Sequence, residues 1–436
     1  MNKKETIKEA SIKKSDRVIS NGENHLDIII ETIQHAAWMR NDGILEIGRS
    51  HSEILPRCPY GTCKKGSTTG FVTSTGRYII DRQEALEIAI KAGQIDPNLD
   101  TIRELGLLSE NFWSDSGYKY DLTNNPPKIG DVVYGKIISV GQHSQIENKN
   151  GRLHNLYDGL RSVFVFGNRY APDYYEGIVP DDFSLEIDML ARSGVVGKVL
   201  NKNIKIKDPT KVKILGYVVD ENGEIINTLN FSIIKSHKEE TKRKNPKLIL
   251  NIGSSMNSGK SLSSASCCKV LSLAGHKVTS SKITGTASLK DILNMEDCGS
   301  SSINDFTYMG YPSTYLLSEE ELVSIFNTID KRNSKKTYDY WIVEIADGIL
   351  QRETAMLLKN DIIRNRIYKL IYSAPDALSV LGGIKILKED FGLVPDAISG
   401  ICSGSPLSMA EAKEKSDIPI FNNINPNMKE LLEILL

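Results

Sequence analysis

The chain has 436 residues, of which 40% are hydrophobic and 25% are charged, a composition typical of a globular protein with two or three domains. The 54 Lys and Arg residues nearly balance the 55 Asp and Glu residues, for a formal net charge of -1. The chain therefore has no overall field to attract nucleic acid or an acidic membrane surface.

No segment approaches the ~20 uninterrupted apolar residues of a membrane-spanning helix, and the polar N-terminus leads into no apolar signal region. The six cysteines are too few and too scattered for a disulfide scaffold in a chain of this length. We therefore expect a cytoplasmic protein with no membrane association.

Two changes in composition predict the domain organisation. The turn-forming cluster at residues 124–127 ends a small α+β domain, predicted for residues 1–125. The charged run at residues 235–246 has almost no apolar content and is predicted to be a solvated linker. Its two glutamates and its lack of aromatic residues argue against a nucleic-acid contact there. Residues 126–234 are predicted to form a β-rich, barrel-like domain, and residues 247–436 an α/β domain.

In the first domain, hydrophobic periodicity predicts a helix over residues 25–39. Residues 71–80 read as a hairpin with its turn at residues 74–76. Asp81 and Glu84 form a capping box at the start of a second helix, and Gly93 is a typical end for that helix. Turn and cap signals of this kind predict local elements but assign no activity to the domain.

Cys58 and Cys63 have four residues between them and lie near His51 and His25. Two cysteines at this spacing can share a zinc ion with a histidine, can form a redox pair, or can be ordinary buried or loop cysteines. No second cysteine pair exists to complete a zinc site, so all three interpretations stay open.

The middle domain carries short segments of alternating hydrophobicity, as in a small barrel. Asp220 to Gly223 is predicted to be a hairpin turn, with the glycine at a position of positive φ. Residues 164–177 are dense in aromatic side chains around Arg169. That segment is either barrel core with a surface turn, or a ligand-facing loop in which Arg169 anchors a carboxylate or phosphate. The predicted strands are residues 130–138, 195–200, 211–219 and 224–229.

The last domain alternates continuous apolar strands with helices, which predicts a parallel sheet covered on both faces. A helix over residues 261–274, ending at Gly275, follows the first strand directly. The predicted strands are residues 248–252, 340–345, 369–372 and 397–401.

A loop rich in small residues joins that first strand to its helix. In such a loop the backbone N–H groups and the positive end of the helix bind phosphate oxygens. Lys260 is expected to reach the β- and γ-phosphates, and the Ser261 hydroxyl to ligate Mg²⁺. The predicted nucleotide-binding residues here are Gly253, Ser254, Ser255, Met256, Asn257, Ser258, Gly259, Lys260, Ser261 and Leu262.

Five residues separate the first glycine of this loop from the Gly-Lys pair, one more than in the common phosphate loop. This spacing resembles dethiobiotin synthetase and related nucleotide-dependent enzymes, a group that includes D-glutamate N-acetyltransferases. The resemblance covers residues 248–436 and implies a P-loop NTPase domain that binds ATP and Mg²⁺. It does not extend to the first 240 residues.

The resemblance also implies roles for residues beyond the loop. Lys282 ends the second strand, where the family places a lysine that faces the γ-phosphate and the substrate. Asp291 or Asp305 matches a carboxylate near Mg²⁺, and Glu344 matches the glutamate on the metal. The loop around Ser403 matches the segment that flanks the nucleobase.

The residues that follow Glu344 bear on the substrate side of the expected site. The family continues from the glutamate with glycines, whereas this chain has Ala346 and Asp347, which predicts a different substrate pocket. Arg352 is expected to stabilise transferred phosphoryl charge. Residues 305–315 are either a substrate-side element or core.

The chain has no Asn-Lys-x-Asp tetrapeptide, the guanine signature of GTPases, which favours ATP.

The sequence therefore predicts a Mg²⁺–ATP-dependent enzyme with a small-molecule substrate. The resemblance implies ligase or transferase chemistry, in which ATP phosphorylates a carboxylate or carbamate and a nucleophile displaces phosphate. One alternative is an N-acyltransferase whose phosphate loop holds the phosphates of an acyl-CoA. Another is a nucleotide-dependent switch that binds a partner protein. A homodimer is expected on the resemblance alone.

Overall fold

The computed structural model describes residues 119–147, 151–220, 222–232, 245–334 and 337–436, with four short strands in the preceding part of the chain. The strands β3 (Phe71–Val72) and β4 (Tyr78–Ile79) pair antiparallel, which confirms the predicted hairpin over residues 71–80. The other two, β1 (Lys64–Lys65) and β2 (Thr68–Thr69), also pair antiparallel. The two predicted helices of the first domain, Cys58, Cys63 and most of the charged run at 235–246 lie outside the described residues.

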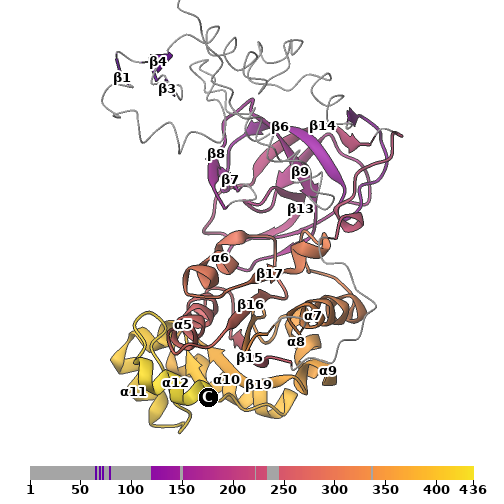
Figure 1. The fold of residues 1–436 in the computed structure, drawn as a ribbon. Coiled ribbons are helices and arrows are strands. Elements are labelled where there is room, and N and C mark those ends of the chain that lie inside the picture. The colour runs from indigo at the N-terminus through magenta and orange to yellow at the C-terminus, as the bar shows by residue number, and fades with distance from the viewer. Residues whose placement is uncertain are drawn as a thin grey trace, which may run out of the picture.

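The strands of the middle part close into a barrel, drawn in purple and magenta in Figure 1. Neighbours in the order β9-β6-β14-β12-β13 pair antiparallel, and β13 closes the ring by pairing parallel with β9. The ring strands are β6 (Val132–Ser139), β9 (Arg161–Phe166), β12 (Glu186–Met189), β13 (Val195–Lys202) and β14 (Thr210–Val219). Flanking them are β5 (Lys119–Asp121), β10 (Arg169–Tyr170), β11 (Tyr175–Ile178) and the hairpin of β7 (Gln145–Glu147) and β8 (Leu153–Asn155).

Alternating side chains of these strands fill the barrel interior, since successive residues of a strand point to opposite faces. Val133, Phe164 and Val212 belong to this buried core. The predicted strands over residues 130–138, 195–200 and 211–219 are confirmed within a few residues.

One strand prediction in the barrel is wrong. Residues 224–229 contain no strand: Ile225 makes only an isolated bridge to Val219, and η3 (Thr228–Asn230) is a 3-10 helix. The side chain of Asn227 caps that helix by accepting a hydrogen bond from the Leu229 N–H at 3.0 Å. The turn before it is confirmed, because Gly223 has φ +82° and its N–H donates to the Asp220 carbonyl.

The last part of the chain is a six-stranded parallel sheet with the order β17-β16-β18-β15-β19-β20. Its strands are β15 (Lys247–Gly253), β16 (Val278–Lys282), β17 (Ile303–Asp305), β18 (Tyr340–Glu344), β19 (Ile367–Ser373) and β20 (Ala397–Ser399). All four predicted strands of this domain are confirmed to within two residues at each end, and so is the helix after the first of them.

Helices cover both faces of this sheet. One buried cluster joins it to α7 (Glu319–Ser334), α8 (Arg352–Lys359), α9 (Asp361–Arg364), α10 (Ala377–Phe391) and α11 (Pro406–Lys413). The other joins it to α5 (Lys260–Leu273), α6 (Leu289–Asp297) and α12 (Met428–Leu435). Leu250 packs into the first cluster and Ile249 into the second, which is why these strands read as continuous apolar runs. None of the described helices is long and apolar enough to cross a membrane.

The barrel sits over the loops that follow the carboxyl ends of β16 and β17 (Figure 1). The Thr228 hydroxyl donates to the Gly310 carbonyl at 2.6 Å, and the Tyr315 hydroxyl donates to Glu176 at 2.7 Å. The Leu289 N–H, at the start of α6, donates to Glu147 at 2.9 Å. Ligands of open α/β sheets bind at this edge of the sheet, so the barrel covers the edge where a ligand is expected.

Candidate functional site

The phosphate loop connects β15 to α5, and two of its glycines are required by close contacts. A Cβ at Gly253 would lie 2.2 Å from the Ser258 Oγ and 3.0 Å from the Ser373 carbonyl. Gly259 has φ +103°, and a Cβ there would lie 2.7 Å from the Cα of Gly400. Only glycine fits such contacts without moving the backbone, so the strand, loop and helix are held in the arrangement that binds phosphate.

Lys260 begins α5 and is 94% buried, with a side chain that turns back onto the loop. Its Nζ donates to the Ser255 carbonyl at 2.8 Å. Burial lowers the pKa of Lys260, while the carboxylates of Glu344 and Asp347 oppose that shift. The ammonium group is therefore already inside the loop, where phosphate oxygens would offer it stronger partners than a carbonyl.

The sheet register brings Lys282 and Glu344 side by side at the ends of β16 and β18. Lys282 forms an ion pair with Asp291, and its Nζ lies 3.7 Å from the Glu344 Oε1. Burial alone would lower the pKa of Lys282, but the two carboxylates outweigh it and raise that pKa. The Ser261 hydroxyl donates to the same Glu344 Oε1 at 3.2 Å. Four of the predicted site residues thus form one cluster.

The donors of this cluster fit a magnesium ion that is shared with phosphate. The Glu344 Oε2 is buried and has no hydrogen-bond partner in the described part of the chain. Across the described residues, no group of three or more His, Cys, Asp or Glu side chains could hold a metal ion by itself. Mg²⁺ is usually held by one or two carboxylates plus substrate phosphates, a role that suits Glu344, Asp291 and Ser261.

The structure holds Asp305 and Arg352 elsewhere. Asp305 lies beside Lys282 in the sheet, but its carboxylate accepts the Thr307 N–H at 2.9 Å and caps η4 (Phe306–Met309). Burial raises the pKa of Asp305 to about 6. The Arg352 Nη1 donates to the Leu317 carbonyl at 2.8 Å and to Glu353 at 2.7 Å. Neither side chain lines the cavity described below.

The remaining predicted residues lie around the loop. Leu262 has an exposed side chain on α5. Ser403, in η5 (Ile401–Gly404), is buried and accepts the Asn423 N–H at 3.3 Å. The side chain of Asn423 in turn donates to the Gly259 carbonyl at 3.1 Å. Ser403 therefore supports the phosphate loop from behind through Asn423, a contact that the sequence did not indicate.

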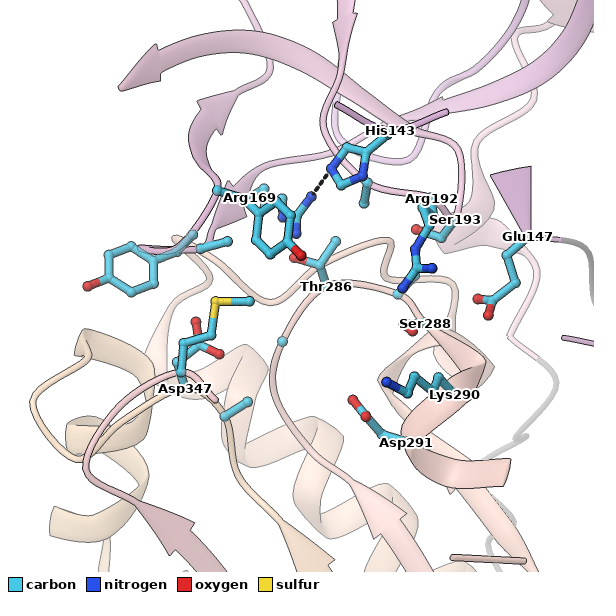
Figure 2. A pocket seen from close by; sticks show the side chains of 18 of the residues that line it. His143, Glu147, Arg169, Arg192, Ser193, Thr286, Ser288, Lys290, Asp291 and Asp347 are labelled. Atoms are coloured by element: carbon cyan, nitrogen blue, oxygen red, sulfur yellow. Dashed lines mark hydrogen bonds between the residues drawn. The ribbon is translucent and has the colours of Figure 1, made fainter. Parts of the chain in front are cut away.

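A cavity of about 450 Å³ lies between the barrel and the α/β part (Figure 2). Its volume is in the usual range of small-molecule sites. Figure 2 shows side chains from both parts meeting in it. The charged and imidazole side chains that line it from the barrel are His143, Glu147, Arg169 and Arg192, and those from the α/β part are Lys282, Lys290, Asp291 and Asp347.

The longer phosphate loop reaches this cavity and the barrel. Met256 and Asn257, at the tip of the loop, both line the cavity. Asn257 has φ +58°, a conformation that asparagine tolerates better than most residues, and its side-chain amide donates to Asp173 of the barrel. The phosphate loop, which is one residue longer than the common form, thus contacts the barrel as well as the cavity.

Sequence reasoning singled out Arg169 among the barrel residues of the cavity and missed His143, Glu147 and Arg192. His143 lies between β6 and β7, and Arg192 in the turn between β12 and β13. No local pattern marks either position, since only closure of the barrel and its docking bring them together. A search of curated proteins with this sequence finds no match.

A family model described as "Phage T4 y16D protein" matches residues 10–113, a segment that falls almost entirely outside the described residues. Solved structures give distant likenesses to the chain. One is the signal recognition particle receptor FtsY from Elizabethkingia anophelis in complex with GDP, at 13% identity and a TM-score of 0.32. The match covers 46% of this chain and 64% of that one, so the chain spans a little under two thirds of the FtsY length.

Two further likenesses are similarly distant. A ParA family ATPase from Chlorobium tepidum TLS matches at 16% identity and a TM-score of 0.28, over 44% of this chain and 88% of that one. HypB from Helicobacter pylori in complex with nickel matches at 14% identity and a TM-score of 0.30, over 44% and 86%. Identities and TM-scores this low assign no family to the chain. The description of the phosphate loop therefore rests only on the contacts within this structure.

Proposed function

We propose that the protein is a Mg²⁺–ATP-dependent enzyme that transfers the γ-phosphoryl group to a carboxylate or carbamate of a small molecule. The observation that carries this proposal is that the phosphate loop and the ion pair of Lys282 with Asp291 line one and the same cavity. Met256, Asn257, Lys282 and Asp291 all line it. A second ligand in that cavity would lie next to the γ-phosphate, as a phosphoryl acceptor must. The dethiobiotin synthetase resemblance of residues 248–436 supports the same chemistry.

In the transfer step, an oxygen of the acceptor bonds to the γ-phosphorus while the bond from that phosphorus to the bridging β,γ-oxygen breaks, and ADP leaves. A carboxylate acceptor is already ionised, so this step needs no base. Lys260 and Lys282 neutralise charge on the phosphoryl oxygens as they move between donor and acceptor. Mg²⁺, held by Ser261, Glu344 and Asp291, supplies further charge neutralisation on the phosphates when bound.

The acyl phosphate formed in this way would then be displaced by a nucleophile, with release of inorganic phosphate. If the nucleophile is an amine, it must also lose a proton. Asp347 lines the cavity opposite Arg169 and His143 (Figure 2), and it forms no ion pair within 4 Å among the described residues. We propose Asp347 as the group that accepts this proton.

The first experiment measures binding and hydrolysis of Mg²⁺–ATP by Lys260→Ala, with Lys269→Ala as the matched control. Lys269 lies on the same helix but is exposed to solvent. Lys260→Ala is expected to weaken Mg²⁺–ATP binding by about 10- to 100-fold, the usual worth of a charged hydrogen bond, whereas Lys269→Ala should bind like the unmodified protein. Equal ATP binding and turnover by all three proteins would disprove the proposal.

A second measurement separates ATP from an acyl-CoA in the same loop. A ligand that binds only the folded protein adds about 2.7 kcal/mol to the free energy of unfolding at 100 times its Kd. We expect Mg²⁺–ATP to raise the melting temperature more than Mg²⁺–GTP, and acetyl-CoA to leave it unchanged. If acetyl-CoA raises the melting temperature and neither nucleotide does, phosphoryl transfer is wrong and acyl transfer is the better interpretation.

A further inference from the structure

The barrel wall of the cavity carries two guanidinium groups. Arg169 and Arg192 both line the cavity, and neither forms an ion pair within 4 Å in the described part of the chain. Burial lowers the pKa of Arg169 to about 10; the charge of Asp347 opposes that shift, and the charge of Arg192 adds to it more weakly. A bound anion would stabilise two cations that share a cavity wall and have no ion-pair partner at contact distance.

Arg169 is the stronger of the two observations because it is 92% buried. Its Nη1 donates to the His143 Nε2 at 2.8 Å, and its guanidinium lies over the Tyr174 ring at 5.2 Å. Its buried Nε has no hydrogen-bond partner among the described residues. Buried cations are normally paired or fully hydrogen-bonded, so Arg169 is an incompletely satisfied cation at the wall of an open cavity.

The carboxylates of the cavity influence the arginines without forming an ion pair with them among the described residues. Burial raises the pKa of Glu147, and the charge of Arg192 opposes that shift. Asp291 is paired with Lys282, and Glu147 accepts the N–H of Leu289 at the start of α6. Asp347 favours the charged form of Arg169 but is not within ion-pair distance of it. Figure 2 shows Arg169, His143 and Arg192 on the barrel side, with Asp347, Lys290 and Asp291 opposite.

We infer that the barrel side of the cavity is an oxyanion site, in which Arg169 and Arg192 hold an anionic group of the substrate. The substrate then carries two anionic groups, one bound by the barrel and the other directed at Lys282 as phosphoryl acceptor. Its class is a short dicarboxylate, or a carboxylate that also carries a phosphate. The assignment of the second group rests on the proposed function, whereas the oxyanion site itself does not.

The inference also assigns a task to the barrel, which lies outside the family resemblance. Guanidinium groups present several N–H donors in a plane that matches the two oxygens of a carboxylate. Because the Arg169 Nη1 donates to the His143 Nε2, that ring nitrogen carries no proton, and His143 fixes the guanidinium without adding a competing charge. The barrel thereby selects the substrate while the α/β part binds the nucleotide.

The test uses the full chain without nucleotide and measures binding of succinate, glutarate and 3-phosphonopropionate by calorimetry. Succinamide, which has the shape of succinate but no charge, is the control ligand. Arg192→Gln and Arg169→Lys are the test variants; the exposed Arg192 carries little risk to folding, and lysine keeps the charge of Arg169 but loses its planar donors. Lys213→Gln, which removes an exposed cation of β14 outside the cavity, is the control variant.

We expect at least one dianion to bind and succinamide not to bind. Arg192→Gln and Arg169→Lys should each weaken the dianion by about 10- to 100-fold, and Lys213→Gln should leave it unchanged. Tighter binding of 3-phosphonopropionate than of succinate would identify a phosphate as the anionic group, and the reverse order a carboxylate. The inference is wrong if the dianions bind no better than succinamide, or bind both arginine variants as tightly as Lys213→Gln.

These outcomes are separable from those for the proposed function. Dianion binding that depends on Arg192, together with ATP turnover that is insensitive to Lys260, would retain the oxyanion site and reject phosphoryl transfer. ATP turnover that depends on Lys260, without dianion binding, would retain phosphoryl transfer and reject the oxyanion site.

Discussion

His143 shows how burial fixes the charge of one side chain in this protein. Burial lowers the pKa of His143 to about 3, and the positive charge of Arg169 adds to the effect, as Arg192 does more weakly. The ordinary pKa of histidine is about 6.5. His143 is therefore neutral in the folded protein throughout the physiological pH range, as its hydrogen bond from Arg169 requires.

A depressed folded pKa makes stability depend on pH with a defined sign. Above pH 6.5 the imidazole is neutral in both the folded and the unfolded chain, and the full stability is present. As the pH falls from 6.5 towards 3, the unfolded chain takes up a proton that the folded protein refuses, so the free energy of unfolding decreases. From this group alone, the expected loss is about 2 kcal/mol at pH 5.

We predict that His143→Gln removes this dependence, because glutamine offers Arg169 an uncharged acceptor that does not titrate in this range. Urea unfolding at pH 7 and pH 5 measures it. The unmodified protein should lose about 2 kcal/mol more than His143→Gln between these two values. His276→Gln is the control, since His276 lies outside the cavity. Equal pH dependence of the unmodified protein and His143→Gln would show that His143 takes up a proton as readily in the folded protein as in the unfolded chain.

At the level of elements, the phosphate loop depends on the backbone of a neighbouring loop. Gly259 caps the start of α5 in a left-handed conformation with φ +103°, and Gly400 faces it from the end of β20 with φ +99°. The two backbones approach so closely that neither position has room for a Cβ. The segment after β20 therefore constrains the phosphate loop through this backbone contact.

We predict that Gly259→Ala costs more stability than Gly275→Ala and weakens nucleotide binding, which Gly275→Ala leaves intact. Gly275 has a similar φ of +88°, but an added Cβ would meet no atom within 4 Å, so its substitution adds strain without a clash. That strain is expected to cost about 1–2 kcal/mol. Urea unfolding and ATP titration measure both effects. Similar losses in the two variants would mean that the contact with Gly400 does not constrain the loop.

The α/β elements could be predicted from sequence because each has a local signature. The strand at 248–252 is a continuous apolar run, and the glycines and Lys260 mark the loop after it. The strand predicted at 224–229 was wrong because the Asn227 side chain bonds to the Leu229 N–H and starts a 3-10 turn instead. Competition of this kind between side chain and backbone is not visible in hydrophobic alternation.

The residues of the candidate site also fall into those with a local sequence signature and those without one. Lys260, Ser261 and Glu344 could be proposed from the sequence because they lie at the end of a strand or in the loop and helix after one, and the structure places the Ser261 hydroxyl on Glu344. His143 and Arg192 come from barrel turns that meet the nucleotide half only through docking. Their positions depend on contacts between residues far apart in the sequence, which no local pattern encodes.

At the scale of the described molecule, the contact between the barrel and the α/β part sets how the two walls of the cavity face each other. We call the contact around Thr228 and Gly310 the seam. Gly310 follows η4 with φ +87°, and its carbonyl accepts the Thr228 hydroxyl of the barrel. A Cβ at Gly310 would lie 2.0 Å from the Thr228 carbonyl oxygen, which is backbone and cannot rotate away. The cavity has one wall from each part, so a shift at this seam must also change the distance between its walls.

We predict that Gly310→Ala loosens the seam, and that dianion binding falls while ATP binding stays, since the loop contacts of Lys260 and Gly259 lie within the α/β part. Hydrogen exchange with mass spectrometry should show faster exchange in residues 226–232 and 307–316, with unchanged protection in β15. Gly223→Ala is the control, because Gly223 has φ +82° but no atom within 4 Å of an added Cβ.

Unchanged exchange at the seam together with full dianion binding would mean that the barrel does not need this contact to complete the cavity. Loss of protection in β15 would instead show that the two parts unfold as one unit, with the barrel contributing to the stability of the nucleotide site itself.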